Sequence, residues 1–74
     1  MTLTGTLTRE DIGTGVYILT DASGRRLHVQ GPVPSSAVGK RVRIEGRAVQ
    51  DQGFGMAGTD GAIAFADPSA LTPL

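Results

Sequence analysis

Apolar and polar residues alternate along several short stretches of the chain, and this period of two is typical of β-strands that bury one face. In residues 2–8, Leu3 and Leu7 alternate with threonines. In residues 40–49, apolar side chains alternate with charged ones, and Gly46 falls on the apolar side, where a strand can bend or bulge. The pattern predicts one strand in each stretch, with hydroxyl and charged groups on the solvent side.

Three further strands are indicated by shorter apolar runs. They are residues 16–20, which are apolar on both faces, residues 26–30 and residues 62–66. Between the first two, the sequence "DASG" is typical of a tight hairpin turn. In residues 26–30 the alternation directs Leu27 and Val29 toward the core. The polar residues Arg26, His28 and Gln30 then face outward.

One short helix is expected between the third and fourth strands. Pro32 and Pro34 lack amide hydrogens and exclude a central strand there, whereas residues 34–38 can form one or two helical turns before Gly39. The resulting order of three strands, short helix, strand, glycine-rich loop and strand is the plan of a five-stranded OB-like Greek-key barrel. We therefore expect an all-β protein with a single barrel domain over residues 1–74.

The composition limits the classes of function. Seven basic and seven acidic residues give a formal charge of zero, so any attraction to nucleic acid or to a membrane surface has to be local. The absence of cysteine excludes disulfides, thiolate nucleophiles and cysteine-ligated metals. The sequence has neither a run of 18 apolar residues nor the pattern of a signal peptide, and we expect a cytoplasmic protein without a membrane partner.

Three motifs within residues 2–49 carry a resemblance to a known group of proteins. They are the start "TLTGTLT", the stretch "YILTDASG" and the stretch "GKRVRIEG". These motifs are similar to those of small bacterial OB-fold domains, in particular short uncharacterised proteobacterial proteins with a TLTG start and a fourth strand close to GKRVRVEG. The resemblance implies the barrel but not the ligand, because OB barrels bind DNA, RNA, sugars and proteins. No site residue is carried over, and residues 50–61 depart from the shorter pattern.

The sequence "GFGMAG" at residues 53–58 matches the G-x-G-x-x-G spacing of dinucleotide-binding loops. Such a loop binds pyrophosphate only where it joins a strand to a helix. Here a turn and a strand are expected to follow, so a nucleotide site through Gly53, Gly55 and Gly58 is rejected. We interpret the segment as a glycine-rich loop that displays Phe54 and Met56, either toward a ligand groove or as a cap on the barrel.

Basic and aromatic residues together indicate a candidate site for single-stranded nucleic acid, which is held by cations along its phosphates and by aromatic rings under its bases. The candidates are Arg26, His28, Arg41 and Arg43 for the phosphates and Tyr17 and Phe54 for the bases. In this interpretation Tyr17 on the second strand lies beside Arg26 and His28 on the third. The alternative is an ordinary solvated face, since Glu45 interrupts the arginines of the fourth strand and the net charge is zero.

Catalysis finds little support in the residue types present. His28 is the only histidine, no nucleophile motif accompanies it, and the aspartates fall in turns or at strand ends. A barrel this small is filled by its own side chains. We therefore expect a non-catalytic binding module without metal or cofactor. Its ligand is either single-stranded DNA or RNA, or else a protein partner or second copy that covers the glycine-rich loop and the C-terminal Leu71 and Leu74.

Overall fold

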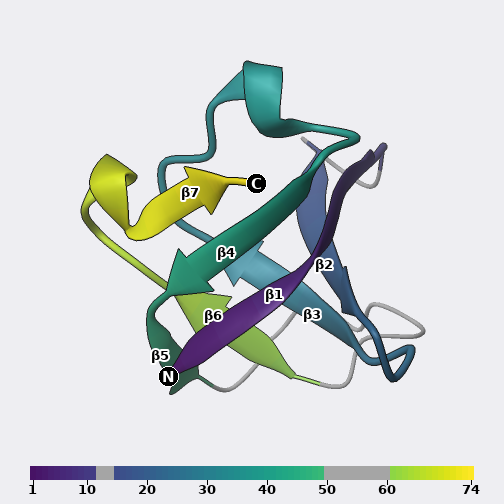
Figure 1. The fold of residues 1–74 in the computed structure, drawn as a ribbon, viewed down its shortest axis with the longest axis horizontal. Coiled ribbons are helices and arrows are strands. Elements are labelled where there is room, and N and C mark those ends of the chain that lie inside the picture. The colour runs from purple at the N-terminus through teal and green to yellow at the C-terminus, as the bar shows by residue number, and fades with distance from the viewer. Residues whose placement is uncertain (12–14, 50–60) are drawn as a thin grey trace.

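The chain forms seven short strands and two 3-10 turns in the residues that the computed structural model describes, namely 1–11, 15–49 and 61–74 (Figure 1). The strands are Thr2–Glu10 (β1), Val16–Asp21 (β2), Arg26–Gln30 (β3), Arg41–Glu45 (β4), Arg47–Val49 (β5), Ala62–Ala64 (β6) and Leu71–Pro73 (β7). The 3-10 turns are Ser35–Ala37 (η1) and Pro68–Ala70 (η2). The predicted all-β class is confirmed. The described strands outnumber the expected five because the predicted fourth strand is divided at Gly46 and β7 forms where none was expected.

All of these strands belong to one sheet, in the order β5-β6-β3-β2-β1-β4-β7. β1, β2 and β3 follow one another as antiparallel neighbours, and β4 pairs antiparallel with the other edge of β1. β6 runs parallel to β3, because the chain reaches it by a crossover through η1, β4 and β5 rather than by a hairpin. Figure 1 shows β4 lying between β1 and β7.

Gly46 joins β4 to β5, two strands that stand far apart in the order of the sheet. The segment Arg41–Val49 therefore pairs with β1 through its first part and with β6 through its last part. A Cβ atom at Gly46 would lie 2.4 Å from the carbonyl oxygen of Ala64 and 3.0 Å from Ile63 Cγ1, closer than side chains normally approach. This position therefore needs glycine, and it is the residue at which the sequence predicts a bend or bulge.

The main hydrophobic cluster lies on one face of the sheet and is built from alternate positions of the strands, while Val16, Ile18 and Ala62 are buried on the other face. The buried cluster consists of Leu7, Leu19, Val29, Ala37, Val42, Ile44, Ile63, Phe65 and Leu71. Leu7 is directly opposite Leu19, and Val29 is directly opposite Ile63. Residues opposed in this way share a face of the sheet. Burial of this face fixes the register, because a slip by one residue would turn the apolar side chains to solvent.

Of the two connections that flank β3, the one before it has the predicted form and the one after it is shorter than predicted. After β2, Asp21 Oδ1 accepts hydrogen bonds from the backbone N–H groups of Ser23 (3.0 Å) and Arg25 (2.9 Å), which forms the predicted hairpin turn. Between β3 and β4, the expected helix is only the 3-10 turn η1. It ends early because Val38 already has extended backbone angles (ψ 132°), and Gly39 follows with φ +85°.

Candidate nucleic-acid interface

The outward face of β1 and β4 carries threonine and arginine side chains. Alternate residues of β1 point away from the core, and its even-numbered positions from 2 to 8 are all threonine. Arg41 of β4 lies directly opposite Thr6, and Arg43 lies directly opposite Thr4. Directly opposed residues of an antiparallel pair share a face, with Cβ atoms about 5 Å apart. We call Thr4, Thr6, Arg41 and Arg43 the threonine–arginine face.

The two arginines of this face point to solvent because the residues that alternate with them along β4 are buried. Val42 and Ile44 alternate with Arg41 and Arg43 and are both 0% exposed, so the guanidinium groups leave β4 on the opposite side. In the part of the chain that the structure describes, the ion pairs are Arg9–Asp11, Arg25–Asp21 and Arg26–Glu10. Arg41 and Arg43 take part in none of these pairs. Their charges are therefore available to a ligand.

A row of residues across four strands extends the threonine–arginine face toward β3. Thr6 lies opposite Thr20 of β2, and Thr20 lies opposite Arg26 of β3. Since neighbouring strands are about 4.8 Å apart, the backbones of Arg41 and Arg26 are separated by about 14 Å. A shallow hollow of about 180 Å³ lies along this row beside Thr6, Thr20 and Arg41. Its hydroxyl and guanidinium donors suit an anionic group.

Asp21 also borders this hollow, and its neighbours keep it ionised. The Ser23 hydroxyl donates to Asp21 Oδ1 at 2.7 Å, and the Arg25 guanidinium lies 3.7 Å from Oδ2. The Ser23 hydroxyl and the Arg25 backbone N–H hold the pKa of Asp21 below its ordinary value of 3.8. Because Asp21 stays ionised at neutral pH, we expect an anion in the hollow to lie toward Arg41.

Arg26 lies on the same outward side, but Glu10 balances its charge. Its Nη2 donates to Oε1 of Glu10. On β2, the residue opposite Arg26 is Thr20, and the residue opposite Glu10 is Val16. Ile18 lies midway between these two positions, so the ion pair crosses Ile18, which is 1% exposed. This predicted phosphate contact therefore also helps to cover an apolar side chain.

His28 and Tyr17 are less accessible than their predicted roles require. His28 is 5% exposed, which leaves little of its surface for a phosphate. Tyr17 lies opposite Val29 on the inward side and is partly buried against the core cluster. The predicted grouping of Tyr17 with Arg26 and His28 is therefore not formed on one face. The pattern could not settle this, because residues 16–20 are apolar on both faces.

The residues expected at a protein interface divide in a similar way. Leu71 is 5% exposed and belongs to the core cluster, whereas Leu74 is 62% exposed. Phe54 and Met56, together with the rest of the sequence "GFGMAG", lie outside the described residues. Only Leu74 of this set is thus placed at the surface, and one leucine is too small to define an interface.

The sequence identifies Arg41 and Arg43 as candidates but does not identify the threonines opposite them. The alternating threonines of β1 are visible in the sequence, and they can be read there as an ordinary wet face. Their pairing with β4 is a contact between distant parts of the chain, and no local pattern predicts it. Thr4 and Thr6 become candidate ligand contacts only once the register is known.

Two general features limit other kinds of site. Among residues 1–11, 15–49 and 61–74, no group of three or more acidic, histidine or cysteine side chains could hold a metal ion. The same ranges contain no helix of the length and apolar character needed to cross a bilayer.

No protein-family model, curated protein or solved structure matches the chain. What the protein binds is therefore inferred from its own geometry.

Proposed function

We propose that the chain is a non-catalytic OB-type binding module whose threonine–arginine face contacts the phosphates of single-stranded DNA or RNA. The observation that carries this proposal is the exposure of Arg41 and Arg43 opposite two threonines, outside the ion pairs of the described residues. Guanidinium and hydroxyl groups on neighbouring strands can donate several hydrogen bonds to the oxygens of one phosphate. Such contacts position a nucleic acid without reading its sequence.

The order of the strand pairings supports an OB-type barrel. β1, β2 and β3 form a meander, β6 lies parallel to β3, and the segment through Gly46 leads from β6 back to β1. An OB barrel has five strands in a Greek-key arrangement, which corresponds to these neighbours when β4 and β5 are counted as one bent strand. β7 is then an addition to that plan.

A single strand is a better ligand for this surface than a duplex. Reading a duplex requires an α-helix or a two-stranded ribbon that enters the major groove. The described residues contain no α-helix, and the β1–β2 and β2–β3 pairs are flanked by further strands of the sheet, so neither is a free ribbon. An open sheet face lets the phosphates run along the cations while the bases reach neighbouring side chains. Phe54 stays the predicted stacking residue for those bases.

Fluorescence anisotropy with labelled single-stranded DNA and RNA of about 12 nucleotides tests the proposal, because one OB fold covers about 4–16 nucleotides. We expect micromolar binding at about 20 mM salt that weakens strongly at about 200 mM. The double variant Arg41→Gln with Arg43→Gln should reduce the slope of log K against log salt by about 1.4, since each phosphate contact on a single strand contributes about 0.7.

The matched control removes the same two charges elsewhere. Arg9 and Arg47 are exposed and do not belong to the threonine–arginine face, so Arg9→Gln with Arg47→Gln should bind like the wild type. Phe54→Ala should weaken binding without changing the salt slope, because stacking displaces no counterions. Absence of binding to both DNA and RNA at low salt, or equal losses in the two double variants, would contradict the proposal.

A further inference from the structure

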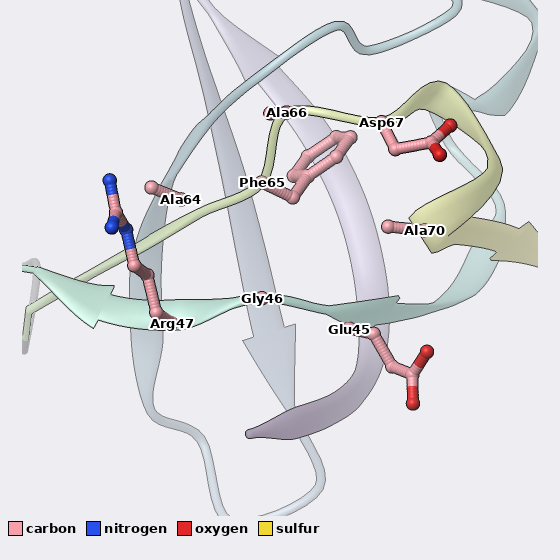
Figure 2. A pocket seen from close by; sticks show the side chains of 8 residues that line it. All are labelled: Glu45, Gly46, Arg47, Ala64, Phe65, Ala66, Asp67 and Ala70. Carbon is pink, nitrogen blue, oxygen red and sulfur yellow. The ribbon is translucent and has the colours of Figure 1, made fainter.

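A second and larger hollow lies on the edge of β4 and β5 that faces away from β1. On this edge Ile44 lies opposite Leu71, and Arg47 lies opposite Ala64. Two residues, 45 and 46, therefore face the six residues 65–70. The longer stretch bulges away from its partner and includes η2. The hollow left at this break has a volume of about 530 Å³ (Figure 2).

The wall of this hollow is apolar and is made of small side chains around one ring. Figure 2 shows the ring of Phe65 between Ala66 and Ala70, with Ala64 on the opposite side of the Phe65 backbone. Phe65 as a whole is 8% exposed, and its ring is held against Gly31, where a Cβ atom would approach it to 2.7 Å. Because the neighbouring side chains are methyl groups, the space is not filled from within. Its volume lies in the usual range of ligand pockets, and its apolar wall suits one aliphatic side chain.

Three charged residues stand around the hollow, and two of them are acidic. Arg47 lies at the end next to Ala64, Glu45 is the last residue of β4, and Asp67 immediately precedes η2. All three are exposed. The backbone N–H of Ser69 donates to Asp67 Oδ1 at 3.0 Å and lowers the pKa of Asp67, so this carboxylate is ionised at neutral pH. The rim thus carries a net negative charge.

We propose that this hollow is a docking site for a short extended peptide of a partner protein that carries an aliphatic side chain followed by lysine or arginine. The aliphatic side chain occupies the space beside Phe65, and the basic side chain meets Glu45 and Asp67. Charge complementarity selects this occupant, because two carboxylates repel the phosphates of a nucleic acid and attract a cation. The hollow shares no residue with the threonine–arginine face, so either proposal can fail without the other.

The first test titrates the ¹⁵N-labelled protein with the peptide acetyl-Gly-Leu-Lys-Gly-amide and follows the amide resonances. We expect shifts at Gly46, Arg47, Ala64 and Ala66 with a Kd of about 1 mM, which suits one buried leucine and exposed ion pairs. Replacing the peptide lysine by glutamate should weaken binding at least about threefold. Replacing its leucine by glycine should weaken it about tenfold or more.

Variants of the protein separate docking from a general effect on folding. Ala66 is exposed and lines the hollow, so Ala66→Leu should fill the space and abolish the shifts. Ser36→Leu adds a similar side chain to an exposed position of η1 and should leave binding unchanged. Glu45→Gln and Asp67→Asn should each weaken the lysine peptide while the spectrum stays that of a folded protein.

Four results would overturn this inference. The first is an absence of peptide-induced shifts at these amides, and the second is equal binding of the lysine and glutamate peptides. The third is a shift of the same amides by an oligonucleotide, which would assign the hollow to nucleic acid. The fourth is a shift that depends on protein concentration without peptide, which would assign the hollow to a second copy of the chain.

Discussion

The two edges of the segment Arg41–Val49 differ in how they are paired. Toward β1 the register is unbroken along all of β4, and hydrogen bonds between Met1 and Gly46, of 2.6 and 2.9 Å, continue it. Toward β6 and β7 the pairing breaks at residues 45 and 46, which face a stretch three times as long. The same segment therefore borders the regularly paired threonine–arginine face on one side and the larger hollow on the other.

This difference shows two ways in which a strand can present a binding surface. Along the unbroken edge, the side chains on each face follow from the alternation of each strand, so the threonine–arginine face is a regular feature of the sheet. Along the broken edge, Phe65 and Asp67 lie near Gly46 because residues 65–70 bulge away from β4 and β5. The alternation of a strand does not predict this arrangement. The first surface tolerates substitution, whereas the second depends on a few close contacts.

The largest expected effect is that of Gly46→Val on the broken edge. A Cβ atom there would meet the Ala64 carbonyl oxygen at 2.4 Å, so we expect the free energy of unfolding to fall by about 3 kcal/mol or more. Thr4→Val introduces the same side chain on the unbroken edge and should change stability by less than about 0.5 kcal/mol. Urea unfolding measures both variants. Similar midpoints for Gly46→Val and the wild type would mean that the two strands do not approach each other closely at this bend.

A smaller loss is expected for Leu71→Ala, which weakens the far end of the broken edge. Leu71 is 5% exposed in the core cluster, and its truncation should cost about 2 kcal/mol, the low end for leucine, because the short edge strand β7 can adjust. Thr72→Ala, exposed on the same strand, is the control and should be nearly neutral. Hydrogen exchange of the Leu74 amide, which donates to the Arg41 carbonyl at 2.9 Å, should accelerate only in Leu71→Ala. Unchanged exchange would show that β7 is held without this side chain.

Much of the sheet could be predicted because its strands carry their own pattern. The threonine alternation of β1 and the arginine alternation of β4 each define an inward and an outward face, and the turn at Asp21 contains residues that favour a hairpin. These are local properties. They place Arg41 and Arg43 on the surface without knowledge of any partner strand.

The remaining features depend on contacts between distant residues. Tyr17 faces inward because Val16 and Ile18 occupy the other side of β2, a choice that a doubly apolar stretch leaves undecided. His28 has the outward position that the alternation predicts, yet it is buried. The hollow beside Phe65 depends on the offset between two pairings, which only the register reveals.

The smallest expected effect is a pH-dependent loss of stability when Asp67 or Asp21 is replaced by asparagine. At the broken edge, hydrogen bonds from the Ser69 backbone N–H and hydroxyl lower the pKa of Asp67. Beside the threonine–arginine face, the Ser23 hydroxyl and the Arg25 backbone N–H lower the pKa of Asp21. A pKa below the ordinary value of 3.8 in the folded state means that the folded protein binds fewer protons than the unfolded chain. Each carboxylate therefore stabilises the folded protein above pH 3.8, and this stabilisation is lost as the pH falls through the lowered pKa. Asp21→Asn and Asp67→Asn should therefore have lower urea midpoints than the wild type at pH 7 and should converge with it once the pH has fallen below the lowered pKa values. The difference should be larger for Asp21, which accepts more hydrogen bonds and pairs with Arg25. A gap that persists at low pH would mean that the amide disturbs the turn itself, and that the ionised carboxylate is not what stabilises it.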